Sequence, residues 1–252
     1  MMAAVTALSQ WKRATGTWAR LYAAFPRMYD FDLLDRSPRL AAGVEGACFA
    51  DLACGTGRIG GWLTDAGART IRGIDRCPEM LEEAARRGCY EMLRLADMTD
   101  TGLESGVHDG VITSMALCHA ADLGAFYREA RRLLKETANA DPRPSSKGKG
   151  PANADPRRPA NGRVLLAIVD YHPFFLLRGI PTHFEHPDSG ERIAIVNHIH
   201  ALSEHFGAGQ RNGFTLREFE ERFVDEAWAD ASPNFAKHLG LPITFLMVFE
   251  SA

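Results

Sequence analysis

The residues best placed to do chemistry begin with a glycine-rich turn at residues 51–58, Asp-Leu-Ala-Cys-Gly-Thr-Gly-Arg. A short apolar run predicts a buried strand that reaches Asp51, and Gly55 and Gly57 follow at G-x-G spacing. Glycine has no Cβ, so a turn of this kind lets the backbone approach a ligand closely. Between a strand and a helix, at the carboxyl edge of a parallel sheet, the turn indicates a site for a nucleotide-type cofactor.

Two kinds of cofactor fit this turn. Residues 55–60 match G-x-G-x-x-G, and Asp75 lies 20 residues after Gly55, where a dinucleotide site places its ribose-binding acid. Asp51 favours the second kind, a cofactor with a cationic amino group. A carboxylate beside the turn attracts a cation, whereas it would repel a pyrophosphate.

Residues 51–57 resemble the D-L-G-C-G-T-G motif of class I S-adenosylmethionine (SAM)-dependent methyltransferases, with Ala53 in place of the first glycine. Three further segments resemble the family in the same order: the strand 71–75 that ends in an acid, the helix start at Pro78, and residues 117–123 after the fourth strand. The resemblance covers residues 45–135 and the strand 163–170. The first residues and the last 80 match only in general layout.

The resemblance implies cofactor residues that follow the carboxyl ends of the first four strands. A Tyr-Asp pair such as Tyr29-Asp30 often precedes the turn in related enzymes, on a helix that covers the cofactor. Asp75 should accept hydrogen bonds from both ribose hydroxyls, because one carboxylate can bond two donors. The expected set is Asp51, Ala53, Gly55 and Gly57 at the methionine end, Asp75 at the ribose, Arg76, Asp97 and Met98 at the adenine, and Ser114 beside the sulfonium.

Two histidines are candidates for catalysis. His119 follows the predicted fourth strand, near the methyl group, and His172 follows the fifth. Two roles stay open for each: a general base that takes the acceptor's proton, or a side chain that lines the pocket or bonds the backbone. Other histidines cluster between 183 and 205, but His183/His186 and His198/His200 lack the i, i+4 spacing of helical zinc ligands. We therefore predict no metal.

Alternating strand and helix patterns from residue 49 to 170 predict right-handed crossovers and a parallel sheet. Near the end, Thr215-Leu216-Arg217-Glu218 matches a capping box that would open a helix through Glu226. A strand at 227–231 would then pair with Ile243–Phe249 in an antiparallel hairpin. The predicted fold class is α/β, with a seven-stranded mostly parallel sheet, helices on both faces and an antiparallel C-terminal strand.

The predicted organisation is a single methyltransferase domain. Its parts are an N-terminal helical cover (1–45), a SAM-binding core (46–136 and 163–170), a disordered insertion (137–162), a substrate lid (171–212), and a C-terminal helix and hairpin (213–252). The insertion is polar and repeats Ala-Asn-Ala-Asp-Pro-Arg at 138–143 and 152–157. The lid segment is rich in aromatic residues and histidine, which suits an apolar acceptor.

Composition limits the partners. The net charge of −3 and pI near 6.3 give no basic field for nucleic acid. Five cysteines without C-x-x-C spacing indicate neither disulfides nor zinc. No long apolar run or signal peptide is evident, so we expect a cytoplasmic monomer or homodimer without membrane contact.

The predicted function is methyl transfer from SAM to an O-, N- or S-nucleophile of a small molecule, by in-line displacement. An NAD(P)-dependent oxidoreductase and a SAM-binding protein without catalysis remain the alternatives.

Overall fold

A computed structural model describes residues 30–136, 164–179, 183–185, 190, 192–231 and 233–251. Most of the predicted N-terminal cover, Tyr29 included, and the whole predicted insertion lie outside these ranges. The described remainder of the cover forms two short helices, α2 (Phe31–Arg36) and α3 (Pro38–Gly43).

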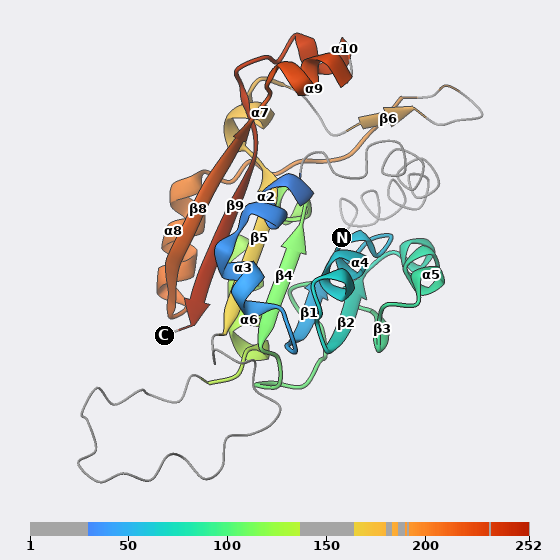
Figure 1. Cartoon of the computed structure of the whole chain (residues 1–252), viewed down its shortest axis with the longest axis vertical. Coiled ribbons are helices and arrows are strands. Elements are labelled where there is room, and N and C mark those ends of the chain that lie inside the picture. Colours follow the sequence, from blue (N-terminus) through green and yellow to red (C-terminus); the bar gives the residue numbers. More distant parts are fainter. Residues whose placement is uncertain are drawn as a thin grey trace, which may run out of the picture.

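A seven-stranded sheet in the order β3-β2-β1-β4-β5-β9-β8 forms the centre of the fold (Figure 1). The first five strands in this order are parallel to one another, whereas β9 runs antiparallel to both β5 and β8. The strands are β1 (Cys48–Leu52), β2 (Thr70–Asp75), β3 (Met92–Leu95), β4 (Gly110–Ser114), β5 (Leu165–Tyr171), β8 (Phe214–Phe223) and β9 (Pro242–Ser251). The predicted fold class is thereby confirmed.

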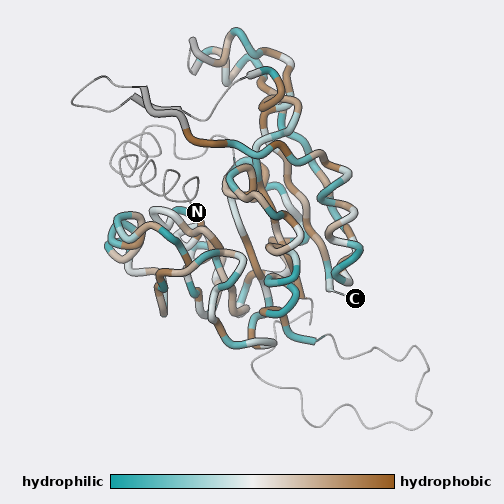
Figure 2. Tube along the Cα trace, turned by 180° about the vertical axis from the view of Figure 1, so that it is seen from behind, coloured by the Kyte–Doolittle hydropathy of each residue, from teal (hydrophilic) through white to brown (hydrophobic). Residues whose placement is uncertain are grey.

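Helices cover both faces of the sheet. One core joins α2, α3 and α4 (Arg58–Asp65) to strand residues such as Phe49 and Ile112. The other joins α6 (Leu123–Leu133) and α8 (Leu202–Arg211) to alternate residues of the same strands. Because both faces are covered, apolar residues dominate a central strand such as β5, and Figure 2 shows brown to white tube through the middle of the molecule.

The remaining elements are short or follow the expected pattern. Helix α5 (Pro78–Arg87) has the predicted bounds, and a 3-10 turn, η1 (Leu117–His119), follows β4. A separate pair, β6 (His183–Glu185) and β7 (Arg192–Ala194), lies outside the main sheet. Helices α7 (Pro173–Leu177), α9 (Glu226–Ala231) and α10 (Pro233–Ala236) gather beyond one end of β5, β8 and β9 (Figure 1).

The predicted helix at 215–226 was wrong, because these residues form most of strand β8. A register shift between Leu216 and Glu218 inserts one extra residue into the strand. As a result Phe214, Leu216 and Phe219 pack on the same core. The bulge turns a two-residue alternation into a three-residue step, which imitates helical spacing.

The predicted strand at 227–231 was also wrong, since these residues belong to helix α9. The Asp225 carboxylate accepts a hydrogen bond from the Trp228 backbone N–H at 3.0 Å, the contact of an N-cap with the first helical turn. Strand β9 therefore pairs with 214–223, so the antiparallel hairpin exists with a different partner strand.

Candidate functional site

A cavity opens at the carboxyl ends of β1, β2 and β4, with the glycine-rich turn on its wall. Its empty space is about 1010 Å³, open mouth included, which is room for a ligand the size of a nucleoside cofactor. The structure brings together on this wall seven of the nine predicted cofactor residues and one of the two histidines. They are Ala53, Gly55, Asp75, Arg76, Asp97, Met98, Ser114 and His119.

The glycine-rich turn has three residues in left-handed conformation, with φ of 57° at Ala53, 53° at Gly55 and 80° at Gly57. Ala53 stands where the resembled motif has glycine, so its Cβ carries a cost of roughly 1–2 kcal/mol. Gly57 does not line the cavity. A Cβ there would lie 3.0 Å from the Ala84 Cα, which explains the glycine as close packing of the turn on α5.

Asp75 is the last residue of β2, and its carboxylate connects the glycine-rich turn to the start of helix α5. Its carboxylate accepts hydrogen bonds from the backbone N–H of Gly55 at 2.8 Å and of Cys77 at 2.9 Å. Burial raises the pKa of this carboxyl, against the effect of those two amides. Each carboxylate oxygen can accept a second hydrogen bond, so Asp75 can hold the turn and bond a ligand hydroxyl together.

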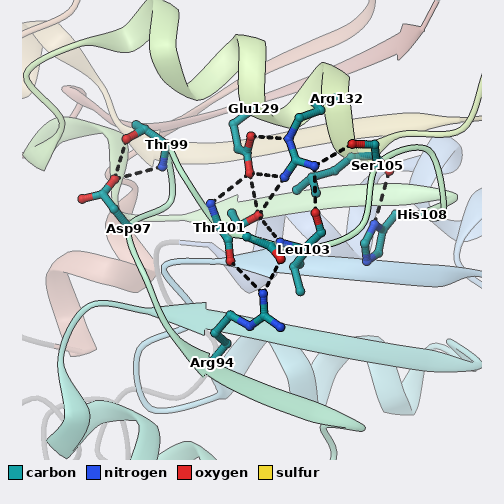
Figure 3. A network of polar contacts seen from close by, with 11 residues as sticks. Arg94, Asp97, Thr99, Thr101, Leu103, Ser105, His108, Glu129 and Arg132 are labelled. Carbon is teal, nitrogen blue, oxygen red and sulfur yellow. Dashed lines mark hydrogen bonds and ion pairs between the residues drawn. The ribbon is translucent and has the colours of Figure 1, made fainter.

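Asp97 and Met98 begin the loop that leaves β3. The Asp97 carboxylate accepts hydrogen bonds from the backbone N–H and the hydroxyl of Thr99, at 2.9 and 2.7 Å (Figure 3). This closed turn fixes the backbone of both cavity residues, and the Ala96 N–H donates to the carbonyl of Asp75 at 3.0 Å.

A buried ion pair also lines the cavity, and sequence reasoning missed its arginine. The two terminal nitrogens of the Arg58 guanidinium, Nη2 and Nη1, donate to Asp30 at 2.9 and 3.1 Å. The Ser114 hydroxyl donates to the same carboxylate at 2.8 Å, and Asp30 is fully buried. The sequence signal that could have found this pair was an arginine directly after the second glycine of the turn and an aspartate, Asp30, upstream of the turn.

Asp51 is not part of the cavity wall. It lies buried behind the turn, where its carboxylate accepts a hydrogen bond from the Tyr90 hydroxyl at 2.7 Å. The Tyr90 ring also explains Gly60, since a Cβ there would lie 2.3 Å from the ring's Cζ. The third glycine of the G-x-G-x-x-G match thus makes room for a tyrosine.

Burial raises the pKa of the Asp51 carboxyl to about 7, from an ordinary value of 3.8. Its Oδ1 has no hydrogen-bond partner among the described residues. In the unfolded chain this carboxyl has an ordinary pKa of 3.8, below its pKa in the folded protein. The buried Asp51 carboxyl therefore lowers the free energy of unfolding more and more as pH rises from 3.8 toward 7, and by a constant amount above that. We therefore expect Asp51→Asn to stabilise the protein by roughly 1–3 kcal/mol at pH 8, with the gain vanishing near pH 4. Urea unfolding at both pH values measures this, and equal stability at pH 8 would contradict it.

His119 lines the cavity, and hydrogen bonds made by its own side chain and by the backbone of the preceding residue fix its position. Its Nδ1 donates to the Val196 carbonyl at 3.0 Å, which leaves Nε2 as the basic nitrogen of the neutral ring. The adjoining Cys118 N–H donates to the Asp170 carboxylate at 2.8 Å. Burial lowers the pKa of His119 to about 4, so the imidazole is neutral at physiological pH.

His172 does not line the cavity, whereas the preceding residue, Tyr171, does. Its Nδ1 accepts from the Phe174 N–H at 3.2 Å and thereby caps α7. Its Nε2 donates to Glu221 at 2.8 Å, so both ring nitrogens have structural partners. Of the two candidate histidines, the cavity lining therefore includes His119 and not His172.

Two searches of the described residues bear on partners. In the ranges with assigned structure, no helix is long and apolar enough to cross a membrane. Over those ranges, no group of three or more His, Cys, Asp or Glu side chains gathers as a metal site.

Comparisons with known proteins agree with this geometry. Residues 50–139 match a family model described as a methyltransferase domain. Human methyltransferase-like protein 27 is 36% identical over 103 residues, which span 35% of this chain and 42% of that protein. The match therefore covers less than half of the human protein's length.

Two solved structures share the fold. An S-adenosylmethionine-dependent methyltransferase from Mesorhizobium loti superposes with a TM-score of 0.60 at 20% identity, over 86% of this chain and 99% of that one. A DhpI–SAH complex gives 0.60 at 19% identity, over 98% and 96%.

The fold and the cavity at the glycine-rich turn define the class I Rossmann-like methyltransferases. Residues 50–139 are a methyltransferase domain by their match to that family model, and the fold is the one that solved SAM-dependent methyltransferases share.

Proposed function

We propose that this protein transfers the methyl group of SAM to a small-molecule acceptor bound at the mouth of the cavity. The observation that supports the proposal most is the set of charged side chains that line the cavity. Three aspartates (Asp30, Asp75 and Asp97) face two arginines (Arg58 and Arg76), and Arg58 is already paired with Asp30. Such a wall suits a cofactor with a sulfonium and an ammonium group and disfavours a pyrophosphate.

The residues present fit the cofactor. Asp75 would hold the ribose hydroxyls, and Asp97 and Met98 would border the adenine. The backbone at Ala53 and Gly55 would border the methionine end, with Arg58 near enough on the same wall to bind its carboxylate. When bound, SAM supplies a methyl group activated by the adjacent sulfonium, so the protein mainly has to align the acceptor and exclude water.

The acceptor side is bordered by Met115, Ala116, His119 and Tyr171. These side chains favour an apolar or aromatic body with one nucleophilic O, N or S atom. The neutral Nε2 of His119 would accept the proton of a hydroxyl or amine as the methyl is transferred. Residues 195–200 lie against the segment that carries His119, because the His198 N–H donates to the Cys118 carbonyl at 2.6 Å and the His200 Nε2 donates to the Ala120 carbonyl at 2.8 Å.

Methyl-labelled SAM tests this proposal. The protein is incubated with the labelled cofactor and a small-molecule extract freed of protein and nucleic acid. We expect label in an extractable small molecule, and less label from Asp75→Ala at a SAM concentration too low to saturate that variant. Label that appears only when RNA or protein is supplied would overturn the small-molecule acceptor. Tight SAM binding without any transfer would identify a SAM-binding protein without catalysis.

A further inference from the structure

The loop between β3 and β4, residues 96–109, connects the cavity to a cluster of polar contacts on α6. Its first residues, Ala96, Asp97 and Met98, line the cavity. It then descends beside α6 until the His108 N–H donates to the Leu133 carbonyl at 3.1 Å (Figure 3). Contacts that hold this loop in place therefore also position the three loop residues that line the cavity.

Glu129 of α6 makes the central contact. Its Oε1 accepts hydrogen bonds from the backbone N–H and the hydroxyl of Thr101, at 2.9 and 2.5 Å. The Thr101 hydroxyl oxygen in turn accepts from the Leu103 N–H at 3.1 Å. Thr101 is fully buried and Glu129 is 6% exposed, so water competes little for these bonds.

Two arginines complete the cluster from either side of the loop. Arg132 donates to Glu129 at 2.6 and 2.7 Å, and also to the Leu103 carbonyl and the Ser105 hydroxyl, both at 2.7 Å. From β3, Arg94 donates to the Gly102 carbonyl. Burial alone would raise the pKa of the Glu129 carboxyl, but the bonds from Arg132 and Thr101 hold it below its ordinary value.

The helix that carries Glu129 is rigidly placed. Phe126, Tyr127, Ala130 and Leu133 of α6 are all fully buried in the core beneath the sheet. Glu129 itself does not line the cavity. It can act on a ligand there only through the loop that it holds.

We propose that Glu129, through Thr101 and with Arg132, is a positioning residue for the base of the cofactor, because it sets where Asp97 and Met98 stand. This inference rests on the proposed binding of SAM in the cavity. It makes base recognition depend on the Glu129 carboxylate of α6, which holds the loop at Thr101, four residues after Asp97.

Two variants of Thr101 and one of Glu129 test the proposal. Thr101→Val removes the hydroxyl at nearly constant shape, and Thr101→Ser restores it. Glu129→Gln removes the charge. Glu250→Gln is a matched control, because Glu250 also bonds two arginines, Arg39 and Arg217, but lies on β9, between β5 and β8. Calorimetry would measure binding of S-adenosylhomocysteine and of its inosine analogue, which lacks the adenine amino group.

We expect Thr101→Val and Glu129→Gln to weaken S-adenosylhomocysteine binding about three- to thirtyfold. Their preference for S-adenosylhomocysteine over its inosine analogue should fall as well, because Asp97 and Met98, which border the base, would have shifted. Thr101→Ser and Glu250→Gln should match the wild type. Circular dichroism confirms which variants fold.

Unchanged affinity and base preference in Thr101→Val would overturn the positioning role. An equal loss in Glu250→Gln would also overturn it, because the effect would then be one of general stability. If the wild-type protein itself bound neither ligand, the proposed function would fail first, so the two failures are distinguishable.

Discussion

Asp75→Ala is expected to weaken binding of SAM roughly ten- to a hundredfold, the value of two charge-assisted hydrogen bonds. In the proposed mode of SAM binding the carboxylate bonds the ribose hydroxyls, and in the structure it also accepts hydrogen bonds from the backbone N–H groups of Gly55 and Cys77. Its loss should therefore remove ligand contacts and loosen the turn together. Titration calorimetry of the purified variant measures the change.

Asp65→Ala is a suitable control for this prediction, because Asp65 is an exposed residue at the end of α4. It should bind SAM as the wild type does. A folded Asp75→Ala variant with wild-type affinity would remove Asp75 from the cofactor site.

His119→Ala is expected to slow methyl transfer about 10²- to 10⁴-fold while SAM affinity stays within about threefold. The imidazole lines the cavity, on the side proposed for the acceptor, and its Nδ1 bonds the Val196 carbonyl, so Nε2 is the basic nitrogen of the neutral ring. Protonation would disable it, so the wild-type rate should fall as pH drops through its pKa. Because burial lowers that pKa to about 4, the rate should stay level from neutral pH down to about pH 5.

His172→Ala is the matched control for catalysis. It should cost about 1 kcal/mol of stability through the lost helix cap, with little change in rate. If His119→Ala turned over at the wild-type rate, catalysis would rest on alignment alone. An acceptor that is already a good nucleophile, such as a thiolate, would then be indicated.

Local sequence patterns predicted the core of the fold well. Strand, glycine turn and helix follow one another within a few residues from Cys48 to Arg87, so short-range signals suffice there. The C-terminal region could not be predicted in the same way. The bulge near Arg217 disguises β8 as a helix, and its strand character comes from pairing with β9 far along the chain.

The cavity was predictable to a similar degree. Residues next to strand ends, such as Asp75 and Asp97, reach it because parallel strands bring their carboxyl ends to one edge. Asp51 was expected at the ligand because of its charge, but Tyr90 approaches from another segment and holds it behind the turn. The pairs Asp30–Arg58 and Thr101–Glu129 join residues 28 apart, and nothing local in the sequence couples them.

Calorimetric titration of the purified wild-type protein with SAM, S-adenosylhomocysteine and NADH tests the central claim most directly. We predict saturable binding of SAM and S-adenosylhomocysteine at one site per chain, and no measurable heat with NADH. Tight binding of NADH together with no binding of SAM would contradict the assignment of this cavity.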